Sequence, residues 1–447
     1  MKKREFLKLS SALMAAPLLS PLAGWAAGSK LKNWAGNLTY STTKIDKANS
    51  VAEVQALVKK YPKMKALGTR HCFNTIADSK DQFVTQVGIK DDYVVIDKVA
   101  KTVTVSSGIK YGQVAPILHR KGFALHNLAS LPHISVAGAC ATATHGSGEK
   151  SGNLSTAVAG MEMVTAAGDL VKLTRAQDGE KFKAAVVHMG ALGVVTKLTL
   201  DIQPTFLMKQ YVYQNMPLTE LQKNFDAIEA SGYSVSLFTN WQTKDITEVW
   251  IKRRADDNRP VEKEWFGAKL ATKNLHPIPE LSAVNCTDQM GVPGPWYERM
   301  PHFKMGFTPS SGVELQSEYY VPRKHAVEAI MAISKLGSKV SPHLFTSEVR
   351  TIAADDLWMS PCYKQDSVTI HFTWKQDWPA VSKLLPIIEK ELAQFGAKPH
   401  WGKLFGIAPK QLETLFPKLT EFRQMAKEYD PKGKFRNDFL NKNLFGV

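Results

Sequence analysis

The sequence predicts a mixed α+β fold in which one domain is interrupted by an inserted second domain. Short helical and strand patterns alternate as far as residue 205, longer ones follow to about 415, and the last residues return to a helical pattern. With 447 residues and 44% hydrophobic composition, the chain can bury large cores and is not a disordered protein. We predict domain boundaries near residues 205 and 415.

The first half shows short helices and hairpins. A polar pair, Asn49 and Ser50, is typical of a helix N-cap, and Gly122 is typical of a helix end. β-Branched alternation predicts hairpins. The expected elements are a helix from 51, a strand before Gly68, hairpins at 93–107 and 161–174, a helix at 111–122, and a helix running into a strand over 180–204.

The second half has longer elements. Apolar residues recur at helical or alternating spacing, and a proline is suited to the first turn of a helix. The expected elements are helices at 218–232, 322–339, 378–396 and 409–429, paired strands at 233–241 and 247–254, and strands around 346–353 and 367–374.

The chain carries 57 Lys and Arg against 41 Asp and Glu, a net charge of +16. Such a charge suggests a polyanionic partner. However, the chain has no run of five like charges, no zinc-finger spacing and no basic region followed by heptads. We therefore predict that it does not bind nucleic acid.

The first thirty residues have the layout of an export signal. A basic start is followed by an apolar stretch at 12–27 that contains prolines and ends in small residues. This stretch is short of the ~20 residues of a membrane span, so we expect no stable span and cleavage after Ala26. An uncleaved amphipathic anchor is the alternative. The segment KREFLK at 3–8 resembles the twin-arginine motif, with lysine in place of the first arginine. The resemblance implies that the twin-arginine machinery exports the folded protein to the periplasm. The general secretory route is the alternative.

Four cysteines are spread along the chain without a short paired spacing: Cys72, Cys140, Cys286 and Cys362. They form no metal-binding quartet. We expect mostly free or buried thiols, with a disulfide in an oxidising compartment as the alternative.

Two loops are rich in small residues, GTRHC at 68–72 and SVAGACATATHGSG at 135–148. Glycine, serine and threonine let backbone N–H groups approach an anion closely. Neither loop has the spacing of the Rossmann or P-loop motifs. The residues alone leave two interpretations open, a close-packing device and a ligand cradle.

Two strand-like segments carry polar residues two positions apart, Glu348 with Arg350 and His371 with Thr373. Residues at this spacing project from one face of a strand. If the strands are neighbours, the four groups form one polar wall. The alternative is a solvent-exposed face with an ordinary ion pair.

Several segments together resemble the alditol oxidases, flavoenzymes of the vanillyl-alcohol-oxidase type. They are GTRHCFN at 68–74, ASLPHISVAG at 129–138, THGSG at 144–148, GALGVVT at 190–196 and HWGK at 400–403, and the similarity extends over nearly everything after Asn33. The resemblance implies a two-domain PCMH-type fold. Its FAD-binding domain would comprise 33–205 and the returning segment 416–447, with an α+β substrate-binding cap at 206–415.

The resemblance also implies that FAD is attached covalently to His71, through a bond between an imidazole nitrogen and the flavin 8α carbon. A neutral imidazole is a suitable nucleophile. Cys72 stands where the family has serine, and a thiol is the weaker donor. The other residues expected to hold the cofactor are Ala66, Leu67, Gly68, Thr69, Arg70, Cys72, Ser130, Ser135, Gly138, Thr142, Ala143, Thr144, His145, Val195 and His400.

On the substrate side, the matching positions imply polyol binding by Ser130, Glu348, Arg350, Thr373 and Lys403, with His371 as a third catalytic group beside Arg350 and Lys403. Two cations can stabilise the alkoxide that develops as hydride leaves for flavin N5, and Lys403 can also accept the proton if its pKa is lowered.

The implied reaction converts the terminal hydroxyl of a polyol such as xylitol or sorbitol to the aldose, while O2 becomes hydrogen peroxide. We expect a monomer. The alternatives are an aldonolactone oxidase or dehydrogenase of the same superfamily and a non-catalytic exported carbohydrate-binding protein.

Overall fold

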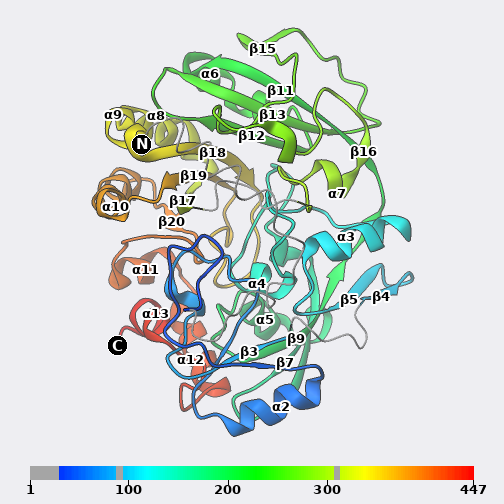
Figure 1. The fold of residues 1–447 in the computed structure, drawn as a ribbon, viewed down its shortest axis with the longest axis vertical. Helices are drawn as coiled ribbons and strands as arrows, with labels where there is room; N and C mark the ends of the chain where they lie inside the picture. Colours follow the sequence, from blue (N-terminus) through cyan, green and yellow to red (C-terminus); the bar gives the residue numbers. More distant parts are fainter. Residues whose placement is uncertain (1–29, 87–93, 307–312) are drawn as a thin grey trace. The chain divides into compact units, whose positions relative to one another are not determined.

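A ten-stranded and a five-stranded antiparallel sheet organise the described part of the chain, residues 30–86, 94–306 and 313–447 of a computed structural model (Figure 1). The expected export segment at 1–26 lies outside these residues. Residues 32–447 form one compact unit. No helix within the described ranges is long and apolar enough to cross a membrane.

The five-stranded sheet comes from the first half of the chain. Its strands are β4 (Val94–Asp97), β5 (Thr102–Ser106), β7 (Val158–Val164), β8 (Leu170–Thr174) and β9 (Val194–Asp201), in the order β4-β5-β9-β7-β8. Two small sheets accompany it. They are the parallel sheet of β1 (Ile45–Lys47), β3 (Phe83–Thr85) and β2 (Lys65–Ala66), and the pair β6 (Phe123–Ala124) and β10 (Gln203–Pro204).

The ten-stranded sheet is built entirely from residues after 206. Its strands are β11 (Leu207–Pro217), β12 (Ser234–Thr239), β13 (Asp245–Arg254), β14 (Glu264–Trp265), β15 (Ala268–Leu270), β16 (Gly294–Pro295), β17 (Glu314–Pro322), β18 (Leu344–Ile352), β19 (Ser367–Lys375) and β20 (Lys398–Pro399). Their order is β14-β15-β11-β13-β12-β18-β19-β17-β20, with β16 beside β11.

The α-helices lie between and after these strands. They are α2 (Val51–Lys60), α3 (Tyr111–Arg120), α4 (Val136–Ala141), α5 (Arg175–Val186), α6 (Leu218–Glu229), α7 (Trp296–Arg299), α8 (Ala326–Lys335), α9 (Gly337–Val340), α10 (Trp378–Ala393), α11 (Pro409–Leu415), α12 (Leu419–Tyr429) and α13 (Asp438–Leu440). The mixture confirms the α+β prediction.

Most expected elements are confirmed where the structure describes them. The Ser50 hydroxyl caps α2 by accepting from the Glu53 backbone N–H at 3.2 Å. The hairpins β4–β5, β7–β8 and β12–β13 all form. All four cysteines are free thiols.

Two helix predictions are wrong in detail. Pro322 is the last residue of β17, and the helix expected from it begins only at Ala326 after a 3-10 turn, Arg323–His325. The helix expected over 409–429 is two helices, because Phe416 precedes Pro417 and takes an extended conformation, which that proline favours.

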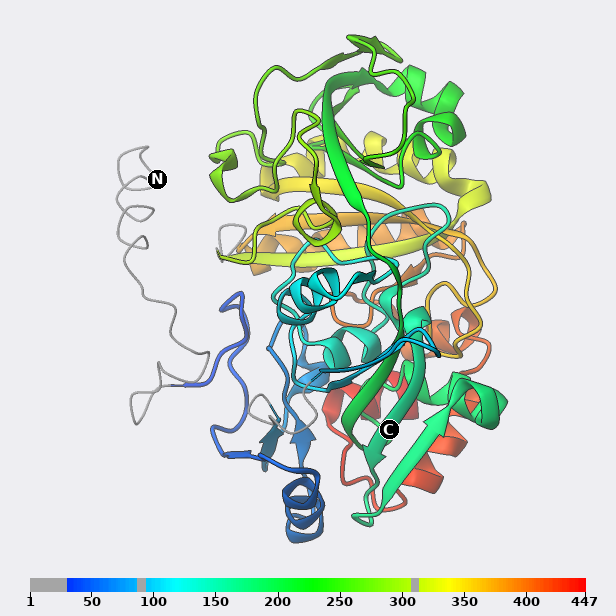
Figure 2. The same cartoon turned by 90° about the vertical axis from the view of Figure 1, so that its right-hand side faces the viewer.

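One face of the large sheet is covered by helices, and the other face lines a cavity. Helix α8 packs on β17 and β19, and α6 and α10 pack beside it (Figures 1 and 2). Along β18 and β19, Val349 and Ile370 belong to the apolar core, while the alternate residues are polar. Because side chains alternate between faces, the polar residues point away from the helices.

The C-terminal segment returns to the first half of the chain. The Met64 N–H donates to the Lys434 carbonyl at 3.1 Å, and the Ala166 N–H donates to the Tyr429 carbonyl at 3.4 Å. Phe435 packs in one apolar cluster with Val84 of β3 and Val164 of β7. This return agrees with an interrupted first domain, although the boundaries at 205 and 415 stay a prediction.

Candidate active site

One cavity connects the two small-residue loops with the polar face of the large sheet. Of the predicted cofactor residues, only Ala143 does not line it. Ala143 is buried, and its carbonyl accepts from the Tyr320 hydroxyl at 3.3 Å. The predicted residues that do line the cavity are Ala66, Leu67, Gly68, Thr69, Arg70, His71, Cys72, Ser130, Ser135, Gly138, Thr142, Thr144, His145, Val195, Glu348, Arg350, His371, Thr373, His400 and Lys403.

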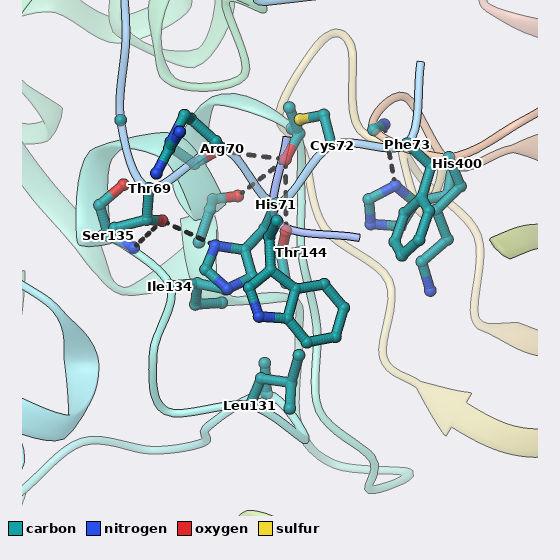
Figure 3. Close-up of a pocket in the computed structure, with 18 of the residues that line it drawn as sticks. Thr69, Arg70, His71, Cys72, Phe73, Leu131, Ile134, Ser135, Thr144 and His400 are labelled. Carbon is teal, nitrogen blue, oxygen red and sulfur yellow. Dashed lines mark hydrogen bonds between the residues drawn. The ribbon is translucent and has the colours of Figure 1, made fainter. Parts of the chain in front are cut away.

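Ser135 joins the two small-residue loops. A Cβ added at Gly68 would lie 2.8 Å from its Oγ, and one at Gly138 would lie 2.9 Å from the same atom. Its backbone N–H donates to the Thr69 hydroxyl at 3.1 Å (Figure 3). At Gly68 the first loop therefore lies directly against Ser135 of the second loop. Close packing of the loops is confirmed, and both loops also line the cavity, as a ligand cradle requires.

His71 carries a neutral imidazole at the cavity wall. Burial lowers its pKa to about 3, and the nearby charges of His133, Lys110 and Arg70 act in the same direction. Its Nδ1 lies 3.0 Å from the Thr69 hydroxyl, whereas the buried Nε2 has no hydrogen-bond partner among the described residues (Figure 3). A neutral imidazole has a free lone pair and is a competent nucleophile.

Two backbone carbonyls among the other cofactor candidates are already paired within the protein. The Thr142 hydroxyl donates to the Gly138 carbonyl at 3.1 Å, and the Val195 carbonyl accepts from Gln86 at 2.7 Å. Burial raises the pKa of the Cys72 thiol to about 11, so Cys72 remains a protonated, weak donor at neutral pH.

The expected polar wall is formed by neighbouring strands. Strands β18 and β19 pair in antiparallel register with Glu348 opposite His371 and Arg350 opposite Thr369. The four predicted side chains are buried and line the cavity. The alternative of a solvent-exposed face with an ordinary ion pair is wrong.

Glu318 is a central residue that sequence reasoning missed. It lies on β17 opposite His371, and its side chain is fully buried. Its two oxygens contact Arg350 Nη2 at 2.6 Å and Lys403 Nζ at 2.5 Å. Burial alone would raise the pKa of Glu318, but Lys403 and Arg350 outweigh it and hold the pKa well below its usual range. A glutamate inside the aromatic strand segment 314–320 was the available signal.

A chain of hydrogen bonds runs from Glu318 to Thr373. Lys403 Nζ lies 2.8 Å from His371 Nδ1, and His371 Nε2 lies 3.0 Å from Thr373 Oγ1. Burial and the Lys403 charge hold the pKa of His371 well below its usual value, so the ring is neutral. Since lysine can only donate, the network assigns the imidazole proton to Nε2, which leaves the Thr373 hydroxyl hydrogen free to point into the cavity.

His302 and Lys252 form a second group without any sequence signal. His302 Nε2 lies 2.7 Å from Glu348 Oε1, and Lys252 Nζ lies 3.1 Å from His302 Nδ1. The His302 backbone N–H donates to the Ser130 carbonyl at 3.1 Å. Burial lowers the pKa of His302 to about 4 and that of Lys252 to about 7. This group holds Glu348 and Ser130 in place at the cavity wall.

Comparison with known families and relatives identifies the chain. Residues 44–174 match the family model described as "FAD binding domain", and residues 310–443 match "D-arabinono-1,4-lactone oxidase". An alditol oxidase from Streptomyces sp. is 44% identical over 416 residues, which cover 93% of this chain and 99% of that protein. The chain belongs to the alditol oxidase family.

The more distant relatives of this chain include lactone oxidoreductases. L-gulonolactone oxidase from Mus musculus is 25% identical, covering 94% of this chain and 99% of that protein. L-gulono-1,4-lactone dehydrogenase from Mycobacterium tuberculosis is 24% identical, and the match covers 92% of this chain and 98% of that protein. Among solved structures, cholesterol oxidase from B. sterolicum has a TM-score of 0.75 at 13% identity and covers 96% of this chain and all of that one. That likeness confirms the vanillyl-alcohol-oxidase-type fold.

The residues of the cavity fit FAD. Gly68 lies against Ser135 of the second loop, and both loops line the cavity, as an anion cradle requires. The buried, unpartnered Nε2 of His71 lies on the same wall. Both features fall in or next to the matched FAD-binding segment. Together with the matched FAD-binding domain and the alditol oxidase relative, they make the protein a flavoprotein.

Proposed function

We propose that this protein is an FAD-dependent oxidase that converts the terminal hydroxyl of polyols such as xylitol or sorbitol to the aldose and produces hydrogen peroxide. The observation that carries the proposal is one cavity that joins the His71 loop to a wall bearing Arg350, Lys403 and Glu348. The name and 44% identity of the Streptomyces relative support it.

The two buried cations suit the chemistry of alcohol oxidation. FAD, when bound, supplies the hydride acceptor and passes the electrons to O2. Arg350 and Lys403 stabilise the alkoxide as the hydroxyl proton leaves. The buried pair formed by Lys403 and the neutral imidazole of His371, with Lys403 Nζ 2.8 Å from His371 Nδ1, is the acceptor for that proton, and burial lowers the pKa of both groups. Ser130, Glu348 and Thr373 bind the remaining hydroxyls.

The reaction is tested by incubating the purified protein with xylitol or sorbitol and following peroxide and flavin absorbance. Bleaching of the flavin by polyol, with peroxide formed in air, is the expected result. A flavin that neither polyol bleaches would contradict the proposal.

A lactone substrate is the second candidate, favoured by the lactone oxidase model that matches residues 310–443. Bleaching by an aldonolactone and not by a polyol would decide for it. Anaerobic reduction followed by mixing with O2 separates an oxidase from a dehydrogenase, because a dehydrogenase reoxidises slowly.

We expect Glu348→Gln to weaken polyol binding. A buried carboxylate that accepts from substrate hydroxyls is replaced by an amide, so KM for sorbitol rises ~10–100-fold while kcat changes less. The comparison substrate is a diol that keeps the terminal hydroxyl and lacks the inner ones. Its KM is expected to change little, and an equal rise for both substrates would contradict the assignment of Glu348 to the inner hydroxyls.

Covalent attachment of FAD at His71 is supported by the neutral imidazole and its unpartnered Nε2. His71→Ala is expected to abolish acid-stable flavin, measured as colour that remains with acid-precipitated protein. His133→Ala is a matched control, since it removes another half-buried histidine, one that does not line the cavity. Full retention of acid-stable flavin in the His71 variant would show that attachment occurs elsewhere.

We also propose that the protein is exported to the periplasm as a monomer after cleavage behind Ala26, with the twin-arginine machinery as its route. The basic and apolar pattern of residues 2–27 supports export. The mass of the purified mature protein tests cleavage and covalent FAD together. A mass that includes residues 1–26 would contradict cleavage.

A further inference from the structure

Residues 32–38, here called the N-terminal strap, lie on the loop that carries His71. The Trp34 backbone N–H donates to the Arg70 carbonyl at 2.8 Å. In return, Arg70 Nη1 donates to the Lys32 carbonyl at 2.9 Å. The two segments are 36 positions apart in the chain, so this pairing is a tertiary contact.

Two asparagine side chains extend the pairing to the other side of His71. Asn33 is buried and donates from Nδ2 to the Cys72 carbonyl at 3.0 Å. Asn37 donates from Nδ2 to the Phe73 carbonyl at 3.0 Å. The carbonyls of residues 70, 72 and 73 therefore all accept from the strap, which holds the backbone on both sides of His71.

The Trp34 indole stacks on the His71 imidazole. The ring centroids are 5.4 Å apart and the planes differ by 19°. Trp34 lines the same cavity as His71. The Thr69 hydroxyl contacts the edge of the imidazole at Nδ1, and Trp34 covers one of its faces. Together these contacts restrain the orientation of the ring.

We propose that Trp34 is a positioning residue for covalent flavin attachment, because it holds the imidazole in the orientation from which a nitrogen can bond to the flavin 8α carbon. This role rests on the proposed attachment at His71. Holding reacting groups in a productive orientation accounts for large rate factors in intramolecular reactions, and Trp34 supplies that restraint without touching the reacting carbon.

The attachment step balances with O2 as the oxidant. A bond forms between an imidazole nitrogen and the 8α carbon, and one C–H bond of the 8α methyl and the imidazole N–H bond break. The two electrons left on the isoalloxazine pass to O2, and the two protons complete hydrogen peroxide. O2 is the oxidant that the proposed reaction already uses.

The test follows attachment in the full chain prepared without flavin and then mixed with FAD. Acid-stable and acid-released flavin are measured over time for the wild type, Trp34→Phe, Trp34→Leu and Trp34→Ala. Trp265→Ala is the matched control, since it removes a half-buried tryptophan whose ring packs on Phe266. Flavin fluorescence measures the affinity for FAD before attachment. A merely structural defect would change this affinity as well as the attachment rate.

We expect Trp34→Ala and Trp34→Leu to bind FAD but to attach it ~10-fold more slowly or worse, and Trp34→Phe and Trp265→Ala to stay near the wild-type rate. Equal rates in the phenylalanine and leucine variants would overturn the role of the stacked ring, even if the alanine variant does not fold. Wild-type protein without acid-stable flavin, or a His71→Ala variant that retains it, would overturn attachment at His71 and with it this role. If the wild type and His71→Ala behave as expected but Trp34→Ala attaches FAD at the wild-type rate, attachment at His71 stands and the role of Trp34 is overturned.

Discussion

Lys403→Met is expected to lower kcat for a polyol by ~10²–10³, because it removes one of the two cations that stabilise the developing alkoxide. Lys403 Nζ is held at 2.5 Å from Glu318 and at 2.8 Å from His371. The charge is therefore fixed in a water-poor cavity, where electrostatic stabilisation is much stronger than at the surface. Stopped-flow measurement of flavin reduction reports this step directly.

Lys398→Met is the matched control for this substitution. Lys398 is also a buried lysine whose pKa is lowered by burial. It lies on β20, just before Lys403 in the chain, and donates to the Pro361 carbonyl at 3.1 Å. It does not line the cavity. Its loss is expected to reduce thermal stability while flavin reduction stays within ~3-fold of wild type. Equal rate losses in the two variants would contradict a catalytic role for Lys403.

Glu318→Gln is expected to destabilise the fold by about 3–5 kcal/mol, because it breaks a buried ionic cluster and leaves two cations without their shared partner. Arg350 and Lys403 both contact the Glu318 carboxylate within 2.6 Å. Chemical denaturation at pH 7 measures the loss. Flavin reduction falls as well, since the two cations lose the contact that positions them.

The pH dependence of this loss has a definite sign. The pKa of Glu318 in the folded protein lies well below its ordinary value of 4.5. A lowered pKa contributes stability that is present above pH 4.5 and is lost as the pH falls below it. The difference in stability between wild type and Glu318→Gln should therefore shrink as the pH is lowered below 4.5. A difference that stays constant would contradict an ionised Glu318.

Glu229→Gln provides the same chemical change at another fully buried glutamate. Burial raises the pKa of Glu229 to about 8, so this side chain is protonated at neutral pH. It accepts from the Thr351 hydroxyl at 2.9 Å, a bond that a glutamine oxygen can also accept. We expect a change in stability within ~1 kcal/mol at pH 7. A loss as large as that of Glu318→Gln would show that burial, rather than ionisation, sets the cost.

The elements that sequence reasoning identified correctly were those with a local cause. Ser50 caps α2 through its own hydroxyl, and the β-branched alternation of β4 and β5 forms the expected hairpin. The errors occurred where packing or a neighbouring proline decided the outcome. Phe416 ends α11 because Pro417 follows it and because its ring packs against Trp401 at 4.6 Å.

For the site, the sequence by itself determined the residue types and their grouping on strand faces, because spacing by two places side chains on one face whatever the fold. The family motifs added His71 and Lys403. Only the tertiary structure decided which buried groups contact them. Glu318 reaches the site from β17, His302 from an irregular segment, and Trp34 from the N-terminal strap. These segments are far apart in the chain, so their contacts depend on strand order and loop packing.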